Sequence, residues 1–328
     1  MDSLENKRVL VTGGTGSFGT SLIKKLLKIG NLAEVIVFSR DELKQFEMKN
    51  QISAPNLRYT LGDVRDRDRL SAVMAGIDYV VHAAAMKQIP ASEDNPTEAI
   101  RTNIGGAENI IATALAEGVK KVIALSTDKA ANPANLYGAT KLCSDKLMIA
   151  ANKIKSDQVT KFSAVRYGNV LGSRGSVIPF FLERKKDGFI PITDEKMTRF
   201  WITLDQGVDF VLNSLTIMKG GEIFVPKIKS FSVLDIAKIV APGLPVRNIG
   251  IRPGEKIHEV MITEDDSNTT FDLLNCFAIV SESVPSYKYY ESSHKKVQSG
   301  FRYSSDNNQE WFTADSFTEL LKELNLLE

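Results

Sequence analysis

Tyr137 and Lys141 are the first candidates for catalytic residues in this sequence. They stand four positions apart at the end of the run STDKAANPANLYGATK, residues 126–141. On a helix this spacing places both side chains on one face. Because a neighbouring ammonium favours the charged form of a phenol, we expect Lys141 to lower the pKa of Tyr137. The pair predicts a general base for an alcohol or sugar hydroxyl.

Three residues at the start of the same run could take part in further proton transfers. Thr127, Asp128 and Lys129 follow an apolar run at 121–125 that predicts a strand. The carboxyl ends of strands line the ligand crevice of open α/β sheets. A simple reductase needs only a hydroxyl there, so an added acid and an added lysine indicate more acid–base chemistry. The alternative is a helix cap at Asp128 and a solvated loop lysine at Lys129.

A glycine-rich turn near the N-terminus is the second candidate site. RVLVT, Arg8–Thr12, predicts a buried strand, and TGGTGSFG follows it, with Gly13, Gly16 and Gly19 three positions apart. A helical pattern then continues to Gly30. This order allows the backbone to approach a pyrophosphate at the N-terminus of the helix, so we expect a bound dinucleotide. The alternative is a structural strand-to-helix turn.

The residues after a second predicted strand, at 34–38, bear on which dinucleotide is bound. NAD-binding domains place an acidic residue at this strand end, where it holds ribose hydroxyls. Here Ser39 and Arg40 stand at that end, and Lys44 follows one helical turn later. Basic side chains suit a 2′-phosphate, so the sequence predicts NADP. The alternative is a helix N-cap of mixed charge, because Asp41 comes next.

Strand and helix patterns alternate through about residue 170. Further strands are expected at 57–61, 79–82, 121–125 and 161–167, and a helix is expected from about 96 to 117. This alternation predicts an α/β fold with a doubly wound parallel sheet of the Rossmann type. We expect residues 1–169 to form the NADP-binding domain, with its sheet completed by about 203–225. Residues 170–328 are expected to form mainly a smaller, interleaved substrate domain.

Composition narrows the class of protein. The 41 basic and 40 acidic residues nearly cancel, which gives no support to nucleic-acid or polybasic membrane binding. Cys143 and Cys276 form no metal motif or disulfide framework, which favours reduced thiols in a cytoplasm. No apolar run approaches the roughly 18 residues of a membrane helix. We therefore expect a cytoplasmic protein with no metal site and no membrane segment.

Together, TGGTGSFG, STDK and YGATK resemble the extended short-chain dehydrogenase/reductase family. STDK is similar to the TDE run of its sugar-nucleotide 4,6-dehydratases, but Lys129 replaces the Glu, and Tyr137 follows Thr127 by only ten positions. With RYGNVLGSRGSVIPFF, MTRFWIT, GGEIFVPK and IRPGEKIHEVM, these departures resemble the inverting UDP-N-acetylglucosamine 4,6-dehydratases of pseudaminic acid synthesis. The resemblance covers most of residues 7–263.

The resemblance implies catalytic roles for Thr127, Asp128, Lys129, Tyr137 and Lys141. Tyr137 would take the proton of the sugar 4-hydroxyl while hydride passes to NADP. Lys129 would remove the C5 proton, and Asp128 would protonate the departing 6-hydroxyl. Lys129 must be neutral for this role, and we expect burial to lower its pKa. The implied product is a UDP-linked 4-keto-6-deoxy sugar of L-arabino configuration.

The resemblance also implies two sets of binding residues. The cofactor contacts are Gly13, Thr15, Gly16, Ser17, Phe18, Gly19, Ser39, Arg40, Lys44, Asp63, Val64, Ala83, Lys87, Thr102, Tyr137 and Lys141. The contacts to UDP-N-acetylglucosamine are Lys87, Asn169, Arg199, Arg252, Pro253, Gly254 and Glu255.

Several of these residues have simpler interpretations. Arg199 stands beside aromatic residues, where a structural cation–π contact is an alternative. The RPGEK run could be a turn with a surface ion pair, and Arg174 and Ser176 could contact the substrate or belong to an ordinary polar turn. His82 has no partner in sequence, and we interpret it as structural. After residue 263 the sequence predicts a variable polar tail with a helix from Ala314.

Two other functions remain open. A UDP-hexosamine 4-epimerase would need Tyr137 but no acid–base pair. A non-catalytic protein that senses NADP would need neither, and the joint presence of Thr127, Tyr137 and Lys141 speaks against it. Family members commonly form hexamers, so the resemblance implies a homo-oligomer.

Overall fold

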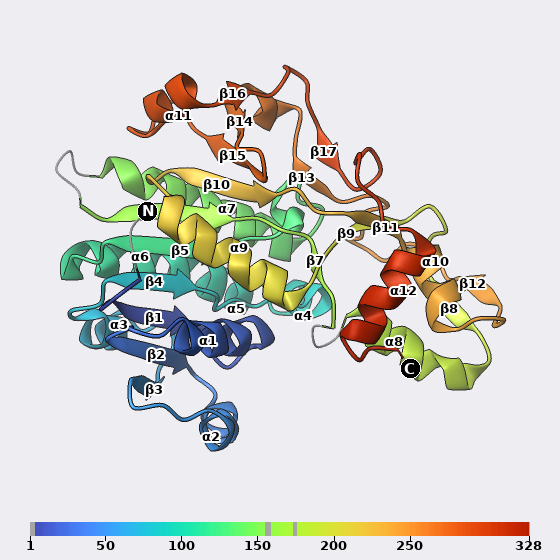
Figure 1. Cartoon of the computed structure of the whole chain (residues 1–328), viewed down its shortest axis with the longest axis horizontal. Helices are drawn as coiled ribbons and strands as arrows, with labels where there is room; N and C mark the ends of the chain where they lie inside the picture. The colour runs from blue at the N-terminus through green and yellow to red at the C-terminus, as the bar shows by residue number, and fades with distance from the viewer. Residues whose placement is uncertain (1–3, 155–158, 173–175, 328) are drawn as a thin grey trace.

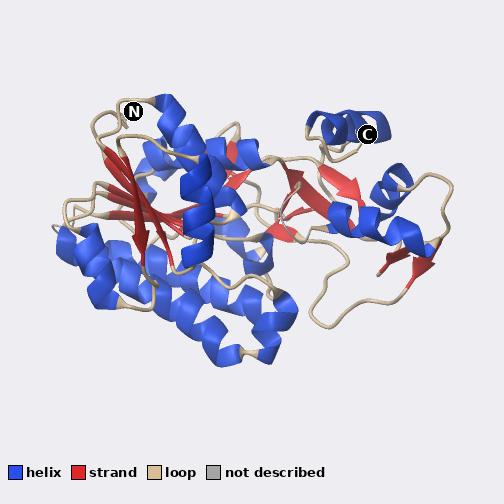
Figure 2. Cartoon of the chain, turned by 90° about the horizontal axis from the view of Figure 1, so that it is seen from below, coloured by secondary structure: helices blue, strands red, loops and turns tan. Residues whose placement is uncertain are grey.

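The computed structural model describes residues 4–154, 159–172 and 176–327. Within these residues the largest sheet has ten strands, and helices cover both of its faces (Figures 1 and 2). In spatial order its strands are β16 (Lys295–Lys296), β14 (Thr270–Asp272), β15 (Cys276–Val280), β10 (Glu222–Pro226), β6 (Lys161–Val165), β5 (Lys121–Leu125), β4 (Tyr79–His82), β1 (Arg8–Thr12), β2 (Glu34–Ser39) and β3 (Leu57–Leu61).

The strands from β10 to β3 in this order all run parallel. Their central members are apolar runs buried along most of their length, as expected for strands covered on both faces. The chain reverses its direction of winding between β1 and β4, where doubly wound sheets bind ligands. The predicted α/β fold with a parallel Rossmann sheet is confirmed, and β6 ends two residues before the predicted 167.

The helices around this sheet connect its parallel strands or pack on its edges. They are α1 (Ser17–Ile29), α2 (Glu42–Gln51), α3 (Arg67–Met74), α4 (Ile89–Asp94), α5 (Pro96–Ile100), the π-helical turn η1 (Arg101–Gly105), α6 (Gly106–Glu117), the 3₁₀ turn η2 (Asp128–Ala130), α7 (Leu136–Ala150), the 3₁₀ turn η3 (Ala151–Lys153), α9 (Leu204–Ile217), the 3₁₀ turn η5 (Asp265–Thr269) and α11 (Tyr287–Ser293).

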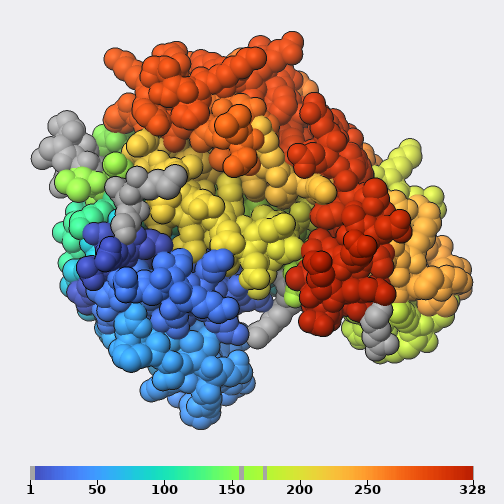
Figure 3. All heavy atoms as spheres, viewed as in Figure 1, coloured from blue at the N-terminus to red at the C-terminus, as the bar shows by residue number. Residues whose placement is uncertain are grey.

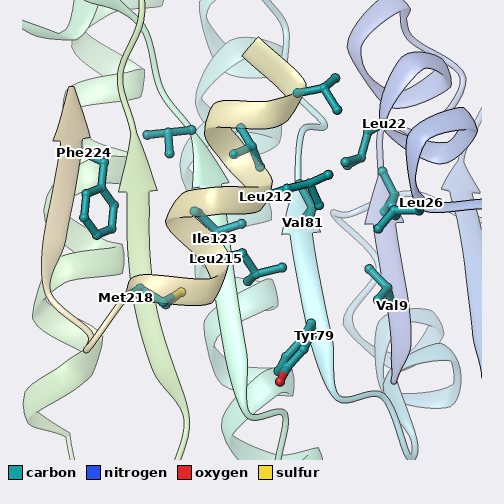
Figure 4. Close-up of a cluster of buried hydrophobic side chains, with 14 of the residues drawn as sticks. Val9, Leu22, Leu26, Tyr79, Val81, Ile123, Leu212, Leu215, Met218 and Phe224 are labelled. Atoms are coloured by element: carbon teal, nitrogen blue, oxygen red, sulfur yellow. The ribbon is translucent and has the colours of Figure 1, made fainter. Parts of the chain in front are cut away.

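Two apolar clusters hold the layers together. On one face, side chains of α1 and α9 pack on the strands, and Figure 4 shows Leu212 and Leu215 of α9 above Val81 and Ile123. On the other face, α3, α6 and α7 pack on the sheet, with Met148 of α7 in their cluster. The helix α9 and the strand β10 come from the second half of the chain, yet both belong to the large sheet and its covering layer.

The strands β14, β15 and β16 differ from the expected polar tail after residue 263. CFAIV of β15 is buried along its length and pairs antiparallel with β10, and β14 pairs with β15 on its other edge. The tail interpretation is therefore wrong for this segment. A five-residue apolar run between polar stretches is too short for periodicity to distinguish it. The helix predicted from Ala314 is confirmed as α12 (Ala314–Glu323).

A smaller lobe stands beside the carboxyl ends of the parallel strands. Figure 3 shows its red C-terminal atoms across a recess from the blue atoms of the first half, with its gold atoms on the outer side. Its elements are β7 (Asn169–Val170), α8 (Val177–Arg184), the 3₁₀ turn η4 (Lys185–Asp187), β8 (Ile190–Ile192), β9 (Thr198–Ile202), β11 (Ser230–Ser232), α10 (Val233–Val240), β12 (Val246–Asn248), β13 (Val260–Ile262), β17 (Tyr303–Ser304) and α12. Within the described ranges, no helix combines the length and apolar character needed to cross a membrane.

Candidate active site

A cavity of about 760 Å³ lies at the carboxyl ends of the parallel strands. Residues that end or follow β2, β3, β4, β5 and β6 line one side of it, and residues from β7 and the starts of α8 and α9 complete it. Its volume is that of a small-molecule site, and its position at the strand ends is where such sheets bind ligands.

Most of the predicted site residues meet in this cavity. Those that line it are Gly13, Thr15, Gly16, Ser17, Phe18, Gly19, Ser39, Arg40, Lys44, Asp63, Val64, Ala83, Lys87, Thr102, Thr127, Lys129, Tyr137, Lys141 and Asn169. The other predicted residues, all within the described ranges, lie outside its lining: Asp128, Arg199, Arg252, Pro253, Gly254 and Glu255. Ser176 lines the cavity, and Arg174 is outside the described residues.

The glycine turn is packed too closely to accept side chains. Gly13 has a φ of 67°, and a Cβ on it would lie 2.8 Å from the backbone of Ala83 and Ala84. A Cβ on Gly19 would lie 2.6 Å from the carbonyl oxygen of Gly13. The turn leads into α1, whose N-cap is Gly16. The amide groups of the first turn of α1 therefore lie at the cavity, as binding of a diphosphate requires.

An unpaired hydroxyl supports a ligand in the same region. The Oγ1 of Thr102 is buried and has no hydrogen-bond partner among the described residues, although Thr102 lines the cavity. Thr102 belongs to the π-helical turn η1, and such turns are frequent at functional sites. The adjacent Asn103 donates to the Thr140 hydroxyl of α7 at 2.9 Å and to the Met86 carbonyl at 2.9 Å. Asn103 therefore links the turn η1 to the segment after β4 and to α7.

The end of β2 has features of both interpretations made from the sequence, a basic site for a 2′-phosphate and a helix N-cap of mixed charge. Asp41 is the N-cap of α2, accepts from the backbone N–H of Lys44 at 3.0 Å and pairs with the Lys44 ammonium at 2.7 Å. Arg40 lines the cavity with 59 % of its side chain exposed, and it lies 3.8 Å from the Asp63 carboxylate. Gln45, which was not predicted, donates to the carbonyl and hydroxyl of Ser39 and holds the strand end in place.

Tyr137 and Lys141 lie on α7, which begins at Leu136 with Asn135 as its N-cap. Burial raises the pKa of Tyr137 to about 12, while the charge of Lys129 and a Thr127 hydrogen bond act in the opposite direction. Burial lowers the pKa of Lys141. The expectation that Lys141 lowers the pKa of Tyr137 is therefore wrong here: the cation that acts on the phenol is Lys129.

Lys129 lies between two buried carboxylates. Its Nζ donates to Oδ1 of Asp128 at 3.0 Å and lies 3.4 Å from Oε1 of Glu259. Thr127, the cap of η2, also donates to Oδ1 of Asp128, at 2.9 Å. Burial acts to lower the pKa of Lys129, but Asp128 and Glu259 together outweigh it and raise that pKa. The expected lowering is wrong because these two charges oppose it.

Asp128 itself is fully buried beneath the cavity wall. Burial raises its pKa, and Glu259 adds to the rise, while Lys129 opposes it. Its Oδ2 has no hydrogen-bond partner among the described residues. Two residues that do line the cavity, Thr127 and Lys129, contact its Oδ1, so a proton held by Asp128 reaches the cavity through them.

The Arg199 side chain donates hydrogen bonds to backbone carbonyls. Its guanidinium donates to the carbonyls of Thr198, Lys256 and Ile257 at 2.7, 2.9 and 2.8 Å. Its Nε lies 3.7 Å from Glu259. These contacts differ from both the expected substrate contact and the expected cation–π contact. A buried guanidinium needs its donors paired, and the end of the RPGEK run and the residue after it supply two of the acceptors.

The RPGEK run forms a turn that rests on the start of α7. Gly254 has a φ of 77°, and its carbonyl accepts from the Asn135 side chain at 2.8 Å. Lys256 donates to the Ala131 carbonyl at 2.7 Å. The Glu255 carboxylate accepts from the backbone N–H of Arg252 at 3.2 Å, so the turn interpretation holds for this residue pair. The loop therefore lies next to the catalytic segment without forming part of the cavity wall.

Sequence reasoning did not assign every residue of the site. Tyr167 and Leu204 line the cavity, and Glu259 contacts Lys129 behind it. Glu259 stands within IRPGEKIHEVM, but nothing in that run pairs it with a lysine after β5. His82 behaves as interpreted: its ring accepts or donates a 2.8 Å hydrogen bond with Thr12, and burial lowers its pKa to about 3, so it is neutral.

The described residues contain no cluster of three or more His, Cys, Asp or Glu side chains suited to a metal ion. The residues that line the cavity carry phenol, ammonium, hydroxyl and carboxyl groups. Tyr137, Lys129 and Thr127 present a phenol, an ammonium and a hydroxyl to one space, with Asp128 one contact away. This set can move protons at two or more positions of one ligand.

Comparison with known proteins agrees with this site. The family of polysaccharide biosynthesis proteins matches residues 9–281. The chain is 52 % identical over 328 residues to a UDP-N-acetylglucosamine 4,6-dehydratase (inverting) of Campylobacter jejuni, covering 96 % of this chain and 97 % of the relative. It is 38 % identical over 333 residues to a UDP-glucose 4-epimerase of Rickettsia canadensis, covering 98 % of this chain and 97 % of the relative.

A solved structure is similar along the whole chain. The X-ray structure of Pen from Bacillus thuringiensis superposes with a TM-score of 0.91 at 38 % identity, covering 99 % of this chain and 100 % of that one. The chain therefore belongs to the polysaccharide biosynthesis protein family, with an extended short-chain dehydrogenase/reductase fold, and is a relative of the inverting UDP-N-acetylglucosamine 4,6-dehydratases.

Proposed function

We propose that this chain is a lyase that removes water from UDP-N-acetylglucosamine across C5 and C6 and inverts C5. The observation that carries the proposal is that Lys129 and Tyr137 line one cavity while Lys129 contacts the carboxyl of Asp128. Oxidation or epimerisation at C4 needs a base such as Tyr137, whereas water loss also needs a base for C5 and an acid for the 6-hydroxyl. The name of the Campylobacter relative supports the same reaction.

We propose NADP as the dinucleotide. When bound, its nicotinamide would accept a hydride from C4 and return it to C6. The close-packed glycines and the first turn of α1 would hold the diphosphate, and Thr102 offers an unpaired hydroxyl. Arg40 and Lys44 line the cavity at the end of β2, where no acidic residue occupies the usual ribose position. Their charges favour a 2′-phosphate.

Tyr137 would take the proton of the 4-hydroxyl in this reaction. Because burial raises the pKa of its phenol, the phenolate needs help, which Lys129 and Thr127 provide in this structure. Lys141, buried on the same face of α7, would hold the cofactor. Lys87 and Asn169, which both line the cavity, would contact the sugar nucleotide.

Lys129 and Asp128 would act as the base and the acid of water loss. In the resting site Asp128 would hold a proton, because burial raises its pKa, and Lys129, with Nζ 3.0 Å from Oδ1 of Asp128, would be a cation. Lys129 would release its proton to solvent before the reaction, and the neutral amine can then remove the C5 proton. Asp128 can give its proton toward the departing 6-hydroxyl through the Thr127 or Lys129 contact. Transfer of one proton from Nζ to Oδ1 after water has left restores the neutral amine and the acid, so the protons balance over one cycle.

Inversion at C5 would follow from the two sides of the sugar ring on which these groups act. A carboxylate base can return the C5 proton to the face from which that proton was taken. Lys129, once charged, lies beside carboxylates that oppose the loss of a proton from its ammonium. Tyr137 would then protonate C5 from the opposite face. Reaction in deuterated water, with the C5 configuration read from proton couplings of the earliest product, tests this. An L-arabino product is expected, and a D-xylo first product carrying deuterium at C5 would contradict inversion.

A UDP-hexosamine 4-epimerase is the second candidate, because the Rickettsia relative at 38 % identity carries an epimerase name. The products of the two functions differ in mass. Incubation of the full chain with UDP-N-acetylglucosamine should give a product lighter by one water. A product of unchanged mass with inverted C4 and no deuterium at C5 would support the epimerase.

The remaining expectations are proposals of the same kind. We propose residues 1–169 as the NADP-binding domain, with its sheet completed by about 203–225, and residues 170–328 as mainly the substrate domain. In the structure β10, β14, β15 and β16 belong to the first sheet, and α9 packs on it. The family resemblance supports a cytoplasmic homo-oligomer, a hexamer, that supplies pseudaminic acid synthesis for flagellin or surface glycans. Light scattering of the purified chain tests the oligomer. We propose no nucleic-acid partner, because basic and acidic residues balance.

A further inference from the structure

Glu259 is a buried carboxylate that none of the roles above uses. It directly precedes β13, and 4 % of its side chain is exposed. Oε1 lies 3.4 Å from Nζ of Lys129 and 3.7 Å from Nε of Arg199. Oε2 is buried and has no hydrogen-bond partner among the described residues. A buried charge of this kind is tolerated only beside a compensating charge, which here is the proposed base of the reaction.

The backbone of Glu259 is fixed from both sides by the C-terminal part of the chain. Its N–H donates to the Ser305 hydroxyl at 2.9 Å, and its carbonyl accepts from the Ser305 N–H at 2.8 Å. The Ser305 hydroxyl in turn donates to the Thr198 carbonyl on β9 at 3.0 Å. The carboxylate is therefore positioned by elements that are separate from the loop carrying Lys129.

We propose that Glu259 is a positioning residue of the active site: it is the fixed counter-ion of Lys129, and it thereby leaves Asp128 able to hold a proton. The inference rests on the proposed dehydratase reaction, in which Asp128 supplies the proton for the departing hydroxyl. One ammonium compensates one buried carboxylate, and a second carboxyl on the same ammonium is favoured in its neutral form.

The surroundings decide which of the two carboxyls is charged. Arg199 and Lys256 add their charges to that of Lys129 around Glu259, whereas the charges nearest Asp128 are Lys129 and the repelling Glu259. The pKa directions agree with this. Burial raises the pKa of Asp128, and Glu259 raises it further; burial alone would raise the pKa of Glu259 too, but Lys129 and Arg199 outweigh it and lower that pKa.

Loss of the Glu259 charge should move the pH dependence of water loss. The groups that face this cluster are Asp128 and Lys129 after β5, Tyr137 on α7, Arg199 on β9 and Lys256 in the RPGEK loop. Removal of one negative charge lowers the proton affinity of every neighbour. Because the groups titrate together, both limbs of the profile belong to the cluster and should move in the same direction.

The first test compares Glu259→Gln with the wild-type full chain, loaded with NADP, in the rate of water loss from UDP-N-acetylglucosamine across pH. We expect both limbs to move to lower pH by about one unit or more, since one unit corresponds to a tenfold change in proton affinity. Glu259→Asp keeps the charge and should move the profile back toward the wild type. Glu264→Gln, which removes an exposed carboxylate from the same segment, should leave it unchanged.

A Glu259→Gln profile that superimposes on the wild-type profile, or that moves to higher pH, would overturn the proposal, even if the rate falls. A lower rate with an unmoved profile is the result expected of a purely structural role. A wild-type chain that removes no water would refute the proposed function instead, and the second test then decides the role of Glu259 by itself.

The second test is infrared spectroscopy of the protein without substrate near neutral pH. We expect a protonated-carboxyl band in the wild type that disappears in Asp128→Asn and also in Glu259→Gln, where Asp128 becomes the counter-ion of Lys129. Circular dichroism checks that both variants are folded. If Glu259→Gln does not fold, the wild type and Asp128→Asn still decide: no difference between their carboxyl bands means that Asp128 holds no proton, and the proposal fails.

Discussion

The glycine turn and the Lys129 cluster both contribute residues to one cavity, and they are built in different ways. The glycine turn is a single run between β1 and α1, in which Gly13, Gly16 and Gly19 close on neighbouring backbone. The Lys129 cluster gathers side chains that follow β5, lie on β9 and precede β13. A contiguous motif carries its own geometry, whereas a gathered cluster depends on the fold.

The two regions also differ in what sets their chemistry. At the glycine turn, amide groups and a helix N-terminus act as fixed dipoles that do not titrate. In the cluster, each ionisable group affects the proton affinity of the others, so the pKa of a residue there depends on groups distant in the sequence as well as on its sequence neighbours. Lys129 shows this most clearly, because Asp128 and Glu259 reverse the effect of its burial.

The largest expected effect separates the hydride step from the proton steps within the cavity. Tyr137→Phe should reduce both cofactor reduction and water loss, each by about 10²–10⁴. Lys129→Ala should reduce water loss by a similar factor while some cofactor reduction remains, because the 4-hydroxyl still meets Tyr137. Single-turnover nicotinamide absorbance and product mass measure the two steps separately. Equal loss of both steps in Lys129→Ala would mean that Lys129 acts mainly on the phenol.

A charge reversal at the cofactor side should affect binding but not the proton steps. Arg40→Asp should weaken NADP by about 10- to 100-fold, because a charge-assisted hydrogen bond contributes about 1.5–3 kcal/mol. NAD should bind nearly as before. Lys49→Asp makes the same change on α2 in a residue that does not line the cavity, and should leave the preference unchanged. Tighter binding of NAD than NADP by the wild type would contradict the NADP proposal.

Addition of a side chain to the closely packed glycine turn should change stability by an intermediate amount. Gly19→Ala places a Cβ 2.6 Å from the Gly13 carbonyl oxygen, so we expect a loss of about 1–3 kcal/mol in the free energy of unfolding. Cofactor binding should weaken as well. Gly207→Ala in α9 is the control, because a Cβ there meets nothing within 4 Å and should stabilise the helix by about 0.5–1 kcal/mol. Denaturant titrations of the two variants measure the contrast.

The same difference, between contiguous motifs and clusters gathered from distant segments, separates what the sequence could predict from what it could not. The strands β1, β3, β4 and β5 begin and end where the short runs between turn residues predict, and β1, β4 and β5 are buried along most of their length. The glycine turn at the cavity was predictable from the same kind of local pattern. The strand β15 and the partners of Lys129 were not, because their assignment depends on contacts between distant segments rather than on periodicity or spacing.

Arg199 shows why resemblance alone could not assign the cluster. A buried arginine in MTRFWIT could contact a diphosphate, an aromatic ring or backbone carbonyls, and all three suit its fork of donors. The fold decides, because the end of the RPGEK run and the residue after it bring the carbonyls of Lys256 and Ile257 to Arg199. The same crossing of the chain brings Glu259 to Lys129.

The smallest expected effect tests whether the gathered cluster depends on remote support. Ser305→Ala removes the hydroxyl that accepts the Glu259 N–H and contacts Thr198, and it should cost about 1 kcal/mol in stability. Because the Glu259 carboxylate then loses part of its positioning, the pH profile of water loss should move in the direction expected for Glu259→Gln, but by less. Ser283→Ala, at an exposed pair of serines, is the control for both measurements. Should Ser305→Ala lower stability without any movement of the profile, the backbone of Glu259 is held by β13 alone, and the cluster is less dependent on the C-terminal segment than its hydrogen bonds indicate.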